Sequence, residues 1–205
     1  MQNTLSHLIA ISKAAQVNIF FMLSLIGFIW AVNLVNWLFL GRYLNILGVY
    51  PRNLFGLVGI IFSPILHGNF NHLFFNTFPL FILGNLILLG GVEFFVTVTV
   101  IIVFLSGLFV WIVGRKSLHI GASSLIMGYW SFLLFDAFRT KSGLAIILGF
   151  VSIYYFGGLL MELFPEDKRT SMEGHISGFI AGIMAIYLYP ILHPYILPYT
   201  QKIFV

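Results

Sequence analysis

Residues 17–39 read VNIFFMLSLIGFIWAVNLVNWLF and contain no charged side chain. A helix needs about 20 mostly apolar residues to cross the hydrocarbon core of a bilayer, so this stretch predicts a membrane-spanning helix. The rest of the chain has the same character. Of its 205 residues, 60% are hydrophobic and 8% are charged, where a soluble domain carries roughly 25% charged residues. This composition indicates an integral membrane protein and excludes a soluble enzyme, a disordered chain and a nucleic-acid-binding module.

Six apolar runs predict an all-α, polytopic membrane protein, a six-transmembrane-helix bundle in one domain. The runs cover residues 17–39, 73–91, 94–113, 120–138, 144–164 and 175–192, the last closed by Pro190 and Pro194. Residues 53–66 are apolar but too short to span, so we expect a half-inserted loop there. On this interpretation residues 1–16 and 193–205 are short tails around a core at 17–192. The lack of extra domains favours a minimal core of the kind found in a prokaryotic inner membrane.

The few charges do not identify a partner. Ten Lys and Arg residues against six Asp and Glu give a net charge of +4 but form no basic patch. With both ends on the inner side, four basic residues would face inward and six outward, against the positive-inside rule. The chain has no Cys, which excludes disulfides, thiol nucleophiles and Cys metal sites.

Uncharged polar residues gather near the starts of the second, fourth and sixth runs. They are His67, Asn69, Asn71, His72 and Asn76; His119, Ser123 and Ser124; and His175 and Ser177. Even-numbered spans run parallel, so these starts lie at one membrane face whichever way the protein is inserted. Polar residues in spans are costly and often functional. We therefore expect a Ser, two His and an Asn at a shared depth.

This set favours acyl-transfer chemistry. A serine hydroxyl needs an adjacent base to act as a nucleophile, and His is the usual base. Ser123 and His175 are therefore the candidate pair. His72 and Asn76 are spaced i, i+4, which places them on one helix face where both can donate to the same oxyanion. For His67 we expect a role in loop structure or transition-state support rather than in direct catalysis.

The carboxylates are poorly placed to complete a triad. Asp136 lies 13 residues beyond Ser123, which is about 20 Å along a helix. Glu93 lies past the far end of the second run, and Glu173 precedes His175 by two residues, a spacing that points the side chains apart. The sequence therefore predicts a Ser–His dyad.

Small residues predict close contact between the fourth and sixth spans. Gly174, Gly178 and Gly182 recur every fourth residue, and Gly121 with the Ser124/Gly128 pair offers a matching small surface. Stripes of this kind let transmembrane backbones approach closely, as a Ser on one helix and a His on another require.

At these residues the sequence resembles the rhomboid family of intramembrane serine proteases. The match covers about residues 15–192 and runs through His72 to Asn76, Gly91-Val-Glu93, Gly121-Ala-Ser123 and His175-x-x-Gly178-x-x-x-Gly182. The resemblance implies that Ser123 is the nucleophile, that His175 is its base, and that His72 and Asn76 join the Ser123 N–H in an oxyanion hole. It also implies a half-inserted loop at 52–66, a mobile cap at 164–171 and cytoplasmic tails. Substrates would be single-span proteins of the lipid bilayer, cut near its outer face.

Two departures from the family pattern keep an alternative open. Ser124 stands where the family usually has Gly, and Met127 stands where it often has Tyr or Phe. The alternative is a catalytically weak or inactive rhomboid-like protein that binds membrane clients. The six histidines suggest a haem or metal protein as a further alternative, but we expect neither cofactor nor metal. Ser123 as a helix cap and His175 as a packing residue are the plain structural readings. The sequence does not fix the oligomeric state.

Overall fold

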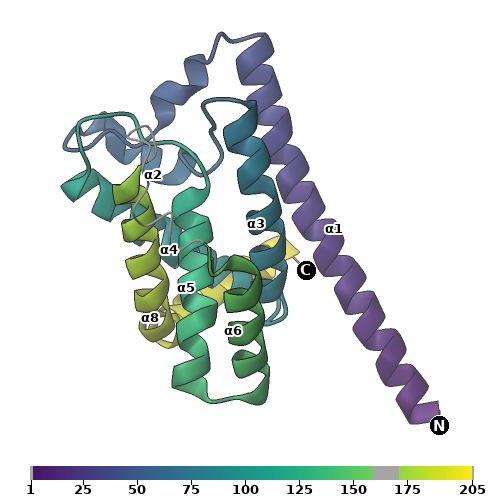
Figure 1. Ribbon diagram of the computed structural model, residues 1–205. Helices are drawn as coiled ribbons and strands as arrows, with labels where there is room; N and C mark the ends of the chain where they lie inside the picture. Colours follow the sequence, from purple (N-terminus) through teal and green to yellow (C-terminus); the bar gives the residue numbers. More distant parts are fainter. Residues whose placement is uncertain (1, 159–170, 205) are drawn as a thin grey trace.

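Most of the described residues are helical (Figure 1). The computed structural model describes residues 2–158 and 171–204. Its elements are α1 (Gln2–Leu38), η1 (Tyr43–Leu47), η2 (Phe55–Leu57), α2 (Gly59–Phe62), α3 (Phe70–Leu88), α4 (Val92–Val113), α5 (Ser123–Thr140), α6 (Gly143–Phe156) and α8 (Met172–Phe204). Within the described ranges no β-strand forms, and an isolated bridge pairs Val49 with His119. The predicted all-α class is confirmed.

Four of the described helices are long and apolar enough to cross a membrane: Gln16–Leu38, Phe70–Leu88, Val92–Val113 and Met172–Ile196. They make the chain a multi-pass integral membrane protein. α5 coincides with the fourth expected span but carries Asp136 and Arg139 near its end. α6 has 14 residues and matches part of the fifth expected span, while residues 159–164 of that span lie outside the described residues. The count of six spans therefore stays a prediction.

The first and last helices extend beyond the expected spans. α1 begins at Gln2, and α8 continues through Pro190 and Pro194 to Phe204. The prediction that these prolines end the last span is therefore wrong. A proline removes one backbone hydrogen bond and bends a helix, but helices in membrane proteins tolerate it where neighbouring groups compensate for the lost bond.

α1 lies beside α3 (Figure 1) in an antiparallel register. Asn18 Nδ2 donates to the Leu88 carbonyl at 3.2 Å, and Trp30 Nε1 donates to Thr77 Oγ1 at 3.0 Å. Between these contacts, Met22 fills the space beside Gly84, where an added Cβ would lie 2.9 Å from the Met22 sulfur. This packing fixes α3, which carries two candidate site residues, against the outer helix.

α5 is the central helix of the bundle, and residues 125–133 are all buried. A helix that is enclosed all round must satisfy its polar groups against its neighbours. Three of its side chains form hydrogen bonds to three neighbouring helices. The Tyr129 hydroxyl bonds to Thr99 of α4 at 2.6 Å. Trp130 donates to the Ser152 carbonyl of α6 at 3.2 Å, and Ser131 donates to the Phe179 carbonyl of α8 at 2.8 Å. The middle of α5 is consequently tied to three neighbouring helices.

Candidate active site

The loop before α5 makes a sharp turn at Gly121. Its backbone N–H donates to the Ser63 carbonyl at 2.9 Å, and its φ is +119°, a conformation that residues with a side chain rarely adopt. An added Cβ would lie 2.6 Å from His72 Nε2. Glycine is therefore required here both by the turn and by the imidazole that occupies the adjacent space.

Ser123 is the first residue of α5 and is half-buried. The N-cap position is occupied by Ala122, whose methyl side chain cannot form a capping hydrogen bond. The first-turn N–H groups of a helix have no intrahelical acceptor, and they form the positive end of its dipole. Ser123 thus lies beside the backbone donors of the first turn of α5, the kind of setting that stabilises an oxyanion.

His175 lies on the first turns of α8 and is 2% exposed. One turn later, Gly178 packs on the backbone of Ser124, where an added Cβ would lie 2.8 Å from the Ser124 Cα. Gly182 packs in the same way on Gly128, with 2.8 Å to its carbonyl carbon. Because Ser123 directly precedes Ser124, this contact sets the turn that carries His175 beside the turn that carries Ser123.

His72 and Asn76 approach the site from α3. That helix begins after Asn69, whose Oδ1 accepts from the His72 N–H at 2.9 Å, a typical N-cap. His72 and Asn76 both face Gly121, whose added Cβ would lie 3.6 Å from Asn76 Nδ2. Gly121, expected as part of the packing surface toward α8, thus makes its nearest contacts with α3. The two candidate oxyanion donors lie against the residue two positions before Ser123.

His67 has a larger part in the site than the sequence indicated. It is fully buried, and its Nε2 lies 3.1 Å from Asn76 Nδ2 and 3.4 Å from the Ala122 N–H. Its Nδ1 lies 3.2 Å from the Ile65 carbonyl. These partners assign a neutral ring that donates from Nδ1 and accepts at Nε2. His67 therefore joins Asn76 to the start of α5.

Electrostatics agree with this assignment. Burial, and next the neighbouring His72 ring, lower the pKa of His67 to about 4. α1 also holds the backbone of His67, because Asn33 Oδ1 accepts its N–H at 2.8 Å and Trp37 Nε1 donates to its carbonyl at 3.0 Å. The only sequence signal for this role was the position of His67 at the head of the polar cluster.

The chain matches a known protein family over most of its length. The family model described as the Rhomboid domain matches residues 54–191. The chain belongs to the rhomboid family. It is 38% identical over 166 residues to uncharacterised proteins of Mycobacterium bovis and Mycobacterium tuberculosis, a match that covers 77% of this chain and 69% of theirs. It is 37% identical over 131 residues to an uncharacterised protein of Mycobacterium leprae, which covers 60% of this chain and 52% of that protein. No solved structure matches it.

The two departures from the rhomboid pattern lie in the first turns of α5. Ser124 supplies the backbone surface on which Gly178 packs, and it lines the same cavity as Ser123. Met127 is 1% exposed and belongs to the hydrophobic core. The expected cap at 164–171 lies outside the described residues except for Ser171.

A small cavity adjoins Ser123 in this rhomboid chain. Its volume is about 30 Å³, and it is lined by Ser63, Ser106, Ser124 and Ser171 together with His119 and apolar residues. One water needs roughly 10–15 Å³ of such space and two to four polar partners. The cavity is therefore large and polar enough for about two water molecules beside the candidate nucleophile.

Of the acidic side chains in the described residues, Glu173 forms an ion pair with Arg115, with 3.2 Å between Oε1 and Nε, and Asp136 lies far along α5, near the opposite end from Ser123. Among the residues whose positions are described, no three His, Asp or Glu side chains group as metal ligands.

Proposed function

We propose that this rhomboid chain is an intramembrane serine endopeptidase with a Ser123–His175 dyad. The observation that carries the proposal is the backbone contact between Gly178 and Ser124. It sets the turn with His175 beside the turn with Ser123, while His72 and Asn76 of α3 lie against the loop that precedes Ser123. Family membership supports the reaction class.

The proposed reaction follows from the roles of these groups. His175 takes the hydroxyl proton as Ser123 Oγ attacks the substrate carbonyl, and it later gives that proton to the leaving amine. The oxyanion accepts hydrogen bonds from the Ser123 N–H, His72 and Asn76. The resulting acyl-enzyme is hydrolysed by water, for which the adjoining cavity provides space.

His67 fits this scheme as a support for Asn76. An amide nitrogen carries two N–H groups, and one of those on Asn76 is directed to His67 Nε2. The second remains for the oxyanion. A neutral His67 thus orients the amide without taking its second donor.

The proposed substrates are transmembrane segments of single-span proteins, cut near the outer face of a prokaryotic inner membrane. The starts of α3, α5 and α8 carry the polar residues, and parallel spans place these starts at one face. A cut there requires the substrate helix to unwind, because a peptide bond in a regular helix is not open to attack.

The test is cleavage of a model single-span substrate in liposomes. Wild type should cleave it, Ser123→Ala should not, and Ser24→Ala on the exposed face of α1 should match wild type. A fluorophosphonate probe should label Ser123 in wild type and fail in His175→Ala. Equal cleavage by Ser123→Ala would refute the dyad. Client binding without cleavage or labelling would favour the inactive, client-binding alternative.

A further inference from the structure

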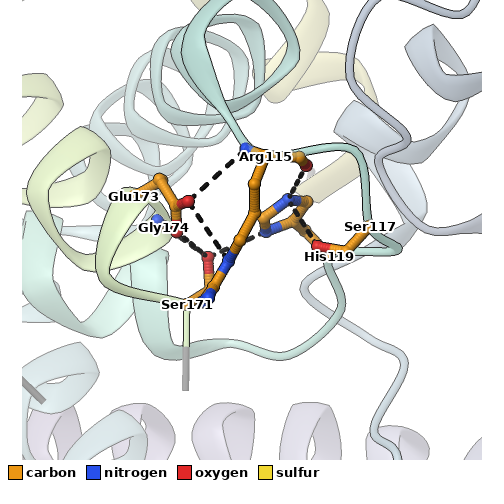
Figure 2. Close-up of polar contacts among 6 residues, drawn as sticks. All are labelled: Arg115, Ser117, His119, Ser171, Glu173 and Gly174. Atoms are coloured by element: carbon orange, nitrogen blue, oxygen red, sulfur yellow. Dashed lines mark hydrogen bonds and ion pairs between the residues drawn. The ribbon is translucent and has the colours of Figure 1, made fainter. Parts of the chain in front are cut away.

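A second polar cluster joins the loop between α4 and α5 to the start of α8 (Figure 2). It consists of Arg115, His119, Ser171 and Glu173, and we refer to these four residues as the latch. None of them belongs to the proposed dyad or oxyanion hole. They come from segments more than 50 residues apart, and Glu173 lies 58 residues from Arg115.

The charged half of the latch holds Glu173 in two ways. Arg115 Nε lies 3.2 Å from Glu173 Oε1, and the Arg115 backbone N–H donates to the same oxygen at 3.4 Å. The side chains are 43% and 20% exposed, so water screens the pair and its share of global stability is small. A backbone donor combined with a guanidinium nevertheless fixes where the carboxylate lies.

The neutral half of the latch connects a helix cap to a fixed imidazole. Ser171 Oγ accepts the Gly174 N–H at 3.0 Å, which caps α8, and lies 2.8 Å from His119 Nδ1. His119 Nε2 lies 3.0 Å from the Arg115 carbonyl, so Nε2 donates there. Nδ1 is then the nearer acceptor for the Ser171 hydroxyl, at 2.8 Å against 3.5 Å for Glu173 Oε2. The backbone of His119 also exchanges two hydrogen bonds of 2.9 Å with Val49. The cap of α8 is thus tied to an anchored residue.

We propose that the latch positions His175 for reaction with Ser123, an inference that rests on the proposed function. The His175 N–H bonds to the Ser171 carbonyl at 3.2 Å, so His175 lies between the latch and the Gly178 contact. Helix ends fray unless other groups hold them. The Gly178 contact holds α8 only from Gly178 onward, so the first turn of α8, which carries His175, needs a further contact. The loop that carries Arg115 and His119 leads directly into Ser123. The latch therefore ties the turn with the proposed base to the same loop that positions the proposed nucleophile.

The activity test compares Glu173→Gln and Ser171→Ala with Lys116→Gln, which alters an exposed neighbour outside the latch. We expect the rate of Ser123 labelling by a fluorophosphonate, and kcat for cleavage, to fall by about 10- to 100-fold, because a displacement of about 1 Å can cost 10²-fold. KM and the thermal midpoint should stay near wild type. The charge exchange Arg115→Glu with Glu173→Arg should recover part of the rate. Rates equal to those of Lys116→Gln, or losses that follow the thermal midpoint, would overturn the proposal.

A second experiment measures the structure of the latch directly and does not depend on protease activity. The chain has no Cys, so spin labels can be attached through Lys116→Cys and Met172→Cys, two exposed positions on either side of the latch. We expect a narrow distance distribution that broadens when Glu173→Gln is added. No broadening overturns the latch. Broadening without a fall in labelling overturns its role in positioning. A wild type that neither labels nor cleaves, but shows the narrow distribution, refutes the proposed function instead.

Discussion

Substituting Gly178 with alanine tests whether backbone contact between α5 and α8 assembles the site. The new Cβ would lie 2.8 Å from the Ser124 Cα and 2.7 Å from its carbonyl carbon, where ordinary contacts are 3.4–4 Å. The obstructing atoms are backbone and cannot rotate away. α8 must therefore move back from α5 by about 1 Å, at a cost typical of overpacking, about 1–3 kcal/mol.

His175 lies one turn from this contact and moves with its helix. A misplacement of about 1 Å can lower a rate about 10²-fold, equivalent to about 2.7 kcal/mol of transition-state stabilisation. We expect Gly178→Ala to reduce both the fluorophosphonate labelling rate of Ser123 and kcat for cleavage by about this factor, together with a lower thermal midpoint.

The matched control is Gly27→Ala on α1. Gly27 is also helical, but an added Cβ there meets nothing within 4 Å. This variant should label and cleave like wild type with an equal or higher thermal midpoint, because Ala favours helix over Gly. If Gly178→Ala behaves like Gly27→Ala, the contact does not set the distance between the proposed base and nucleophile, and the reasoning is wrong.

Three further predictions concern the residues around the site. Gly121→Ala should abolish labelling of Ser123, because it combines a φ of +119° with a clash against His72. The control is Gly91→Ala, which has a φ of +96° but open space around the added Cβ, so it should show the effect of backbone strain alone. Because the folded state holds the pKa of His67 at about 4 against 6.5, the unfolded chain binds the proton first. Stability should be full above pH 6.5 and fall by up to about 3 kcal/mol toward pH 4, a loss that His67→Gln should reduce in thermal melts across this range. Asn33→Leu leaves the His67 backbone N–H unpaired, while the Ile65 carbonyl keeps its bond from His67 Nδ1, so the thermal midpoint should drop in line with about 1–3 kcal/mol for that one group; an unchanged midpoint would contradict that reasoning.

The sequence predicted the helices better than their ends, because hydropathy reports burial while caps and turns set the boundaries. The second span was expected at 73–91 but begins at Phe70, since Asn69 caps it. The fourth was expected at 120–138 but begins at Ser123, since the positive φ of Gly121 cannot continue into a helix. Apolar composition carries neither signal.

For the candidate site, the sequence likewise predicted which helices meet but not the contacts that the loops make. Parallel spans and small-residue spacing were enough to expect Ser123 and His175 near each other. The contacts of His67 could not be predicted, because its partners, Asn76 and Ala122, lie 9 and 55 residues away. Contacts of this kind depend on how loops close, and no periodicity in the sequence records them.

The distribution of charge links the membrane environment to the form of the proposed site. A buried carboxylate carries a large desolvation penalty in a low-dielectric bundle unless it is fully paired. Glu173, close in sequence to His175, lies instead at the partly exposed edge with Arg115. The inner groups named above are uncharged: a neutral His67, the Asn76 amide and the serines that line the cavity. Orientation that a triad obtains from a buried acid would here come from helix contact at Gly178 and from the latch. On this reasoning, changing the small residues at that contact should impair the reaction more than removing a carboxylate outside the latch, such as Asp136.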